Sequence, residues 1–141
     1  MIELAILKAF CGDKAVYTAY RKGLPLSYIK TNFKEIYKLF NILDLIYQKR
    51  DLTQISREEL EASYIASYPI LKDTERKEVS SLIQRTFDTP LPDSLPELLK
   101  TYAYRAAAGE ITLAAIACNE GRKGGLEALR KAVAALEVSS E

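Results

Sequence analysis

Apolar residues recur at intervals of three and four positions over most of the chain. This spacing places them on one face of an α-helix. The clearest case predicts a helix from about Tyr28 or Asn32 to Lys49. Its apolar stripe consists of Phe33, Ile36, Phe40, Leu43 and Tyr47. No alternating apolar and polar run of convincing strand length is present, so the pattern predicts an all-α protein.

Glycines and short polar residues mark the ends of the predicted helices. A first helix over Ile2 to Phe10 precedes Asp13, which can cap a second helix that ends before Gly23. The segment "GLPLS" after it is predicted to be a loop. Ser56 and Glu59 form a capping box, which predicts a helix from the next residue to Pro69. A further helix begins at Asp73 or Thr74 and carries Val79, Leu82, Ile83 and Phe87.

The segment "DTPLPDS" contains two prolines and is the best internal boundary of the chain. It separates a compact head of five helices, residues 1–89, from residues 90–141. The second part begins with another capping box, Ser94 and Glu97, and has a glycine-rich turn in "NEGRKGG". A short turn between two amphipathic segments predicts an antiparallel helical hairpin. We expect head and hairpin to form one structural unit.

A heptad spacing predicts which residues of the hairpin meet between its two arms. In the first arm these residues are Leu95, Leu99, Tyr102, Ala106, Gly109, Leu113 and Ile116. In the second arm they are Leu126, Leu129, Val133 and Leu136. A second face of the first arm contains Ala103, Ala107, Ala114 and Ala117. Two interpretations of that face stay open: it contacts another subunit or the head, or its alanines only raise helix propensity.

The charge distribution singles out one region of the head. The net charge is +1, but residues 14–50 contain eight Lys/Arg against two Asp/Glu, and residues 51–97 contain five against ten. Lys30, Lys34 and Lys38 share a helix face among several tyrosines. Basic side chains with stackable aromatics can bind single-stranded nucleic acid. The other interpretation is that the tyrosines pack while the lysines are solvated.

The residues offer little for catalysis or metal binding. The chain has no histidine, and its two cysteines, Cys11 and Cys118, fall inside predicted helices, where they read as small core residues. "GRKGG" lacks the Lys-Ser/Thr ending and the preceding strand of a phosphate loop. No apolar run is long enough to span a membrane. We therefore predict no catalytic, cofactor or metal site and a reduced, cytoplasmic setting.

Several segments resemble the N-terminal domain of DnaB-type replicative DNA helicases, and the resemblance covers essentially the whole chain. "IELAILKAF" is similar to the opening of that domain, and "YIKTNFKEIYKLFNIL" and "LTQISREELEA" are similar to two of its later helices. "LPELLKTYAYRAAAGEITLAAIA" and "GLEALRKAVAALE" resemble the two arms of its hairpin. The stretch "YPILKDTERKEV" is closer to a divergent phage member of the family.

The resemblance implies a non-catalytic collar domain of a hexameric helicase. In that family the hairpins pair between subunits, and head and hairpin offer surface to primase or to a helicase loader. DNA is engaged by a motor domain that follows in the sequence. The polar ending "EVSSE" is then expected to mark a fragment cut before the linker to the motor. The alternative function is a small helical nucleic-acid-binding protein that uses the Lys30, Lys34 and Lys38 face.

Overall fold

The structure, a computed structural model, describes residues 2–140. Within them the chain forms eight α-helices, one 3-10 turn and no strand, so the prediction of an all-α protein is confirmed. The helices of the head are α1 (Ile2–Gly12), α2 (Lys14–Tyr20), α3 (Leu26–Asn32), α4 (Lys34–Lys49), α5 (Arg57–Ser67) and α6 (Asp73–Asp88), with the 3-10 turn η1 (Arg21–Gly23) after α2. The remaining two are α7 (Leu95–Asn119) and α8 (Gly125–Ser140).

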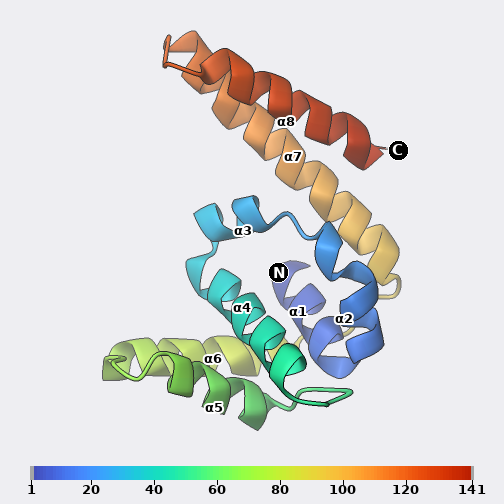
Figure 1. Ribbon diagram of the computed structural model, residues 1–141, viewed down its shortest axis with the longest axis vertical. Coiled ribbons are helices and arrows are strands. Elements are labelled where there is room, and N and C mark those ends of the chain that lie inside the picture. The colour runs from blue at the N-terminus through green and yellow to red at the C-terminus, as the bar shows by residue number, and fades with distance from the viewer. Residues whose placement is uncertain (1, 141) are drawn as a thin grey trace.

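The head surrounds α1, which packs against α2, α4, α6 and α7. Helices α5 and α6 lie side by side at one end of the molecule, and α7 and α8 project together from the other end (Figure 1). Helices α7 and α8 run in opposite directions and are joined by a short turn. The amphipathic pattern explains the head, because the apolar stripes of α1 and α4 are buried against each other. Their fully buried residues include Leu4, Ile6, Leu7, Phe10, Leu39, Phe40 and Leu43.

Two of the three predicted helix caps form as the sequence indicates. The Asp13 carboxylate accepts a hydrogen bond from the Ala15 amide at 2.9 Å. Ser56 and Glu59 make both hydrogen bonds of a capping box. The third prediction is wrong: the side chain of Ser94 makes no capping hydrogen bond at the start of α7. Proline occupies the first turn of α7 and removes one of the N–H donors that the hydroxyl would need.

The predicted long helix of the head is two helices, because the chain breaks between α3 and α4. Helix α3 starts at Leu26, inside the segment predicted to be a loop, and ends at Asn32. The Asn32 amide donates to the carbonyl of Tyr28 at 2.9 Å, so it competes with the backbone for that acceptor. Phe33 leaves the helical conformation, with φ −141° and ψ 70°, and its ring packs edge-on to Tyr28. This break sets the direction of α4.

The first turns of α7 pack on the head. Leu99 and Tyr102 are buried in the same cluster as α1, and Leu95 packs against that cluster. The Tyr102 hydroxyl donates to a carboxylate oxygen of Glu3 at 3.2 Å, and Glu3 is only 6% exposed. Burial, together with that carboxylate, raises the pKa of Tyr102 above its ordinary value. Helix α7 therefore completes the core of the head before it meets α8.

Two glycines of the hairpin occupy different environments and should respond oppositely to alanine. A Cβ at Gly109 would lie 3.6 Å from the Tyr28 ring, an ordinary contact, and alanine gains up to about 1 kcal/mol of helix propensity. A Cβ at Gly125 would lie 2.9 Å from the Cys118 backbone, which forces the arms apart and costs about 1–3 kcal/mol. We expect Gly109→Ala to raise the melting temperature and Gly125→Ala to lower it, by a few degrees each. Thermal melts followed by circular dichroism measure both, and a stabilising Gly125→Ala would contradict the close contact.

The Tyr102–Glu3 contact should stabilise the junction between head and hairpin. Tyr102→Phe removes the hydroxyl and leaves a buried carboxylate oxygen without this donor, which costs about 1–3 kcal/mol. Tyr104→Phe is the matched control, because Tyr104 lies on the same helix and is exposed, so its effect should stay within about 0.5 kcal/mol. Urea unfolding measures both free energies. Equal stabilities of the two variants would show that the buried hydrogen bond contributes nothing.

Candidate functional site

The alanine face that we predicted to meet another subunit lies inside the hairpin. Gly125 of α8 packs on the Cys118 backbone, so the side of α7 that bears Cys118 faces α8. Ala114 and Ala107 lie one and three turns earlier on that side, and both are buried. Ala103 and Ala117 are half-buried. The small side chains of Ala107 and Ala114 therefore let α8 approach, and contact of this alanine face with another subunit stays a prediction.

Five of the predicted seam residues of the first arm lie on the face of α7 that packs on the head. Leu95, Leu99 and Tyr102 pack on the head, Ala106 is buried on the same face of α7, and Gly109 contacts Tyr28. The heptad spacing identifies a true apolar face, but the head covers its first half, so α8 packs on a different face. In the second arm Leu129 is half-buried and Ala132 is buried. The side chain of Leu136 lies outside those that the structure describes.

Four further residues of the predicted seam are exposed apolar side chains, two on each arm of the hairpin. Leu113 and Ile116 continue the face of α7 that packs on the head, and they are 60% and 47% exposed. On α8, Leu126 and Val133 are 53% and 39% exposed. Their exposure differs from that expected for residues between the arms, since on α8 the buried side is the one that carries Gly125, Leu129 and Ala132. Large apolar side chains that are left open to solvent on a rigid hairpin are candidates for an interface.

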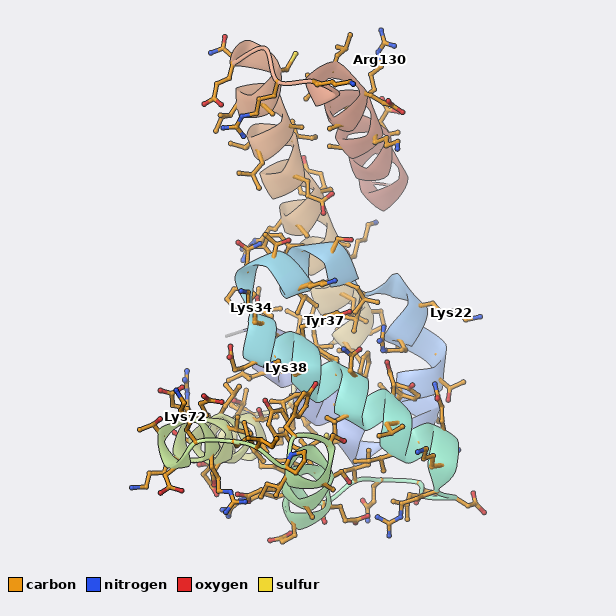
Figure 2. The ribbon with its side chains drawn as sticks, turned by 60° about the vertical axis from the view of Figure 1, so that its left-hand side comes forward. Lys22, Lys34, Tyr37, Lys38, Lys72 and Arg130 are labelled. Carbon is orange, nitrogen blue, oxygen red and sulfur yellow. The ribbon has the colours of Figure 1, made fainter. Side chains whose placement is uncertain are left out.

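The three lysines of the predicted basic face come from two consecutive helices. Lys30 lies on α3. Lys34 and Lys38 lie on α4, with Tyr37 between them in the sequence (Figure 2). The Lys30 ammonium lies 5.8 Å from the centre of the Tyr37 ring, and the Lys38 ammonium lies 5.2 Å from that of Tyr68. Lys30 and Lys34 are exposed. We call Lys30, Lys34 and Lys38 the basic row.

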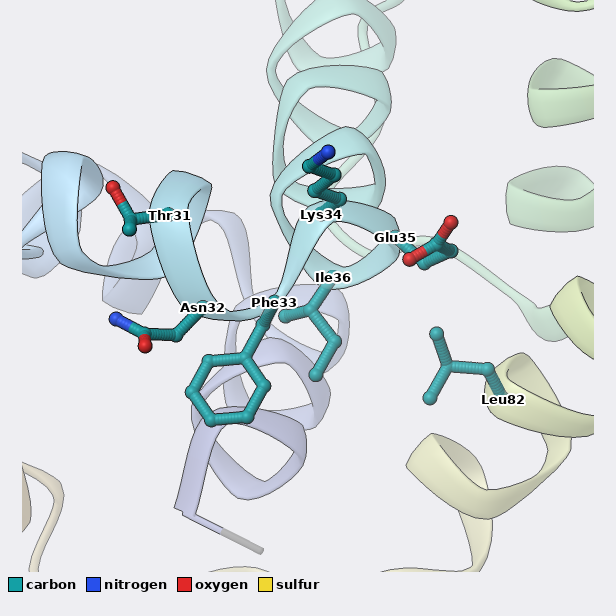
Figure 3. Close-up of a pocket in the computed structure, with 7 residues that line it drawn as sticks. All are labelled: Thr31, Asn32, Phe33, Lys34, Glu35, Ile36 and Leu82. Atoms are coloured by element: carbon teal, nitrogen blue, oxygen red, sulfur yellow. The ribbon is translucent and has the colours of Figure 1, made fainter.

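A pocket of about 400 Å³ opens beside the basic row, where α3 meets α4. Phe33, Ile36 and Leu82 form its apolar wall, and Leu82 comes from α6 (Figure 3). Its other lining residues are Thr31, Asn32, Lys34 and Glu35. The sequence pattern did not indicate this pocket, because it arises at the break between α3 and α4 that periodicity had joined into one helix.

A charged cluster that the sequence analysis did not identify ties α2 and η1 to α4. Arg21 donates to both carboxylate oxygens of Asp44, at 2.8 and 2.5 Å, and the Tyr17 hydroxyl donates to the same carboxylate at 2.7 Å. Burial first, and then this hydrogen bond, raise the pKa of Tyr17 to about 12. The signal was present in the sequence, since Tyr17 and Arg21 are four residues apart and Asp44 is one of only two acids in the basic segment.

The structure offers no obvious chemistry at the cysteines or carboxylates. Cys11 is buried and Cys118 is half-buried at the end of α7. Burial raises the pKa of the Cys11 thiol to about 12. Within residues 2–140 no three His, Cys, Asp or Glu side chains gather closely enough to hold a metal ion. No helix of this described part is both long and apolar enough to cross a membrane.

Comparison with known proteins identifies no relative. No protein-family model, no curated protein and no solved structure matches the chain. The arrangement of the residues is therefore the basis for the functional argument.

The burial of the two thiols predicts a large difference in their reactivity. We expect an aromatic disulfide reagent at neutral pH to modify Cys118 quickly and Cys11 only as the protein unfolds, because the Cys11 thiol is buried and stays protonated. Absorbance of the released thiolate counts the reactive groups, and Cys118→Ser should remove the fast phase. A fast phase that survives in Cys118→Ser would mean that Cys11 is accessible in the folded protein.

Proposed function

We propose that this chain is a non-catalytic assembly domain that associates with copies of itself through the hairpin and offers its head to a partner protein. The architecture that supports the proposal is a packed helical head with a rigid hairpin projecting from it (Figure 1). This is the arrangement expected for the collar of a DnaB-type replicative helicase, whose partner is a primase or a helicase loader. In that setting the ring is a hexamer, and nucleotide hydrolysis and DNA unwinding belong to a motor domain outside residues 1–141.

The observation that carries the proposal is an apolar stripe on α7 that continues beyond the part covered by the head. The stripe is buried at Leu99 and Tyr102 where it meets the head, and it is open at Leu113 and Ile116. Both halves lie on one regular helix, so the open half keeps the spacing of a packing surface. A second copy of the hairpin would extend the packing that the head begins, by covering the open half.

The magnitude of this burial predicts weak association. Complete burial of a Leu, Ile or Val side chain is worth about 1.5–3 kcal/mol. Leu113, Ile116, Leu126 and Val133 are each about half exposed, so two copies could gain roughly 6–12 kcal/mol if all four were covered. Association costs about 4–15 kcal/mol in lost freedom. Isolated chains should therefore pair only at high concentration, and a ring would need contacts beyond the hairpin.

The far end of the head is the surface that we propose for the partner protein. Ile70 follows Pro69 in the turn between α5 and α6, and it is 96% exposed. The turn is fixed by two packed helices, and Tyr64 beneath it is buried. A fully exposed isoleucine on a rigid projection suits a partner with an apolar pocket. This end lies away from the hairpin, so self-association leaves it free (Figure 1).

Sedimentation velocity over a range of concentrations tests the self-association. We expect the wild type to shift toward a dimer or larger species as concentration rises, and Leu113→Glu with Ile116→Glu to stay monomeric, because charges would be buried without partners. The matched control is Tyr104→Glu with Ala115→Glu, which adds the same charge at two exposed positions three turns apart on another side of α7.

The control pair and circular dichroism separate a lost interface from a lost fold. The control pair should associate like the wild type, and circular dichroism should show the same helicity for both pairs. Glutamates at Ala107 and Ala114 serve another purpose: they enter the packed seam with α8 and should melt the hairpin. A wild type that remains monomeric at every concentration, or a control pair that dissociates as fully as the test pair, would refute assembly through this face.

A further inference from the structure

The basic row is rigid and carries charge that the rest of the head does not cancel. Within the described residues, none of Lys30, Lys34 and Lys38 forms an ion pair. Ile36, Leu39 and Phe40 of α4 are buried, so the core holds the helix that carries Lys34 and Lys38. Successive members on α4 are one turn apart, about 6 Å along the axis. The row is thus a fixed line of positive charge.

The nearby acids do not neutralise the row. Asp44 is bound by Arg21 and Tyr17. Glu35 is adjacent to Lys34 in the sequence, but the two side chains diverge, and Glu35 points toward α6 (Figure 3). Residues 2–50, which include the row, contain nine Lys/Arg against four Asp/Glu, whereas the segment of α5 and α6 on the other side of the pocket is acidic. A polyanion is the ligand class that such a row attracts.

The pocket beside the row indicates which kind of polyanion binds there. Phe33 supplies an aromatic ring at its wall, with Ile36 and Leu82 beside it (Figure 3). The Asn32 amide nitrogen is used by the carbonyl of Tyr28, which leaves its oxygen to accept a hydrogen bond. Lys34 lines the pocket and belongs to the row. A volume of about 400 Å³ is within the usual range for small-molecule sites.

We infer that the basic row and the Phe33 pocket form one binding site for single-stranded nucleic acid. The lysines contact successive phosphates, and one base enters the pocket, where it stacks against Phe33 and meets the oxygen of Asn32. A single strand is favoured over a duplex because only unpaired bases expose their faces to an aromatic ring. The site lies on the head, so it is independent of the hairpin contact proposed above.

The backbone part of the site is tested by fluorescence anisotropy with labelled oligo(dT) of about 15 nucleotides. Three phosphate contacts give a slope of roughly −2 for log affinity against log salt, so binding should weaken about 20-fold between 50 and 200 mM KCl. The triple variant Lys30→Gln, Lys34→Gln, Lys38→Gln should lose most of this slope. The triple variant Lys100→Gln, Lys123→Gln, Lys131→Gln removes the same charge from exposed positions on α7, the turn and α8, and should bind within about threefold of wild type.

The pocket part is tested with two substitutions at one position. Phe33→Leu keeps apolar volume but removes the aromatic face, and oligo(dT) binding should fall by about fivefold or more. Phe33→Tyr keeps the ring and should bind like wild type. Melting temperatures of both variants show that the head is folded, because Phe33 also packs on the core cluster.

Four outcomes would overturn the inference. The first is equal affinity of the two lysine variants, and the second is equal affinity of Phe33→Leu and Phe33→Tyr. The third is a duplex of the same length that binds as tightly as the single strand. The fourth is polyglutamate that displaces oligo(dT) at the same charge concentration, which would assign the row to an acidic protein partner.

Discussion

The packing of the first half of α7 against the head determines the rest of the architecture. Tyr102 donates its hydroxyl to Glu3, and both side chains are almost completely removed from water. A rotation of α7 about its axis would separate them and leave a buried hydroxyl and a buried carboxylate oxygen without each other. Leu99, in the same cluster, fixes the same face. The hydrogen bond therefore fixes the rotation of α7 while the apolar neighbours supply most of the burial.

That rotation decides which residues remain for α8. With the large apolar residues of α7 turned to the head, the side left for α8 carries Ala107 and Ala114. Small side chains allow close approach, and the contact of Gly125 with the Cys118 backbone shows how close the arms come at the turn. The same rotation leaves Leu113 and Ile116 with no cover, because α7 is longer than the head that packs on it. The open apolar face thus follows from the length of one helix.

Local features of the fold, such as helix caps, could be predicted from the sequence. Which helix packs on which face could not. Asp13 and Ser56 mark their helix starts because capping depends on residues within three positions. Heptad spacing identified a genuine apolar face on α7, but periodicity says nothing about which element covers a face. The break at Phe33 was missed for a related reason: Tyr28, Ile36 and their neighbours keep helical spacing across it. Side-chain competition by Asn32 and packing of Phe33 on Tyr28 decide the break.

The two surfaces of the molecule differ in their physics as well as their location. The hairpin face is apolar, so its association depends on buried area and changes little with salt. The basic row acts through charge on the head, where its interactions weaken as salt increases. Lys34 and Lys38 stand on α4, whose buried face includes Phe40, so the two ammonium groups keep their spacing whether or not hairpins pair. Because α7 is held to the head through Tyr102, the hairpin and the row also keep a fixed relative orientation. An assembly built through the hairpins would therefore repeat the basic rows at regular positions around it, so that one polyanion could contact several subunits at once.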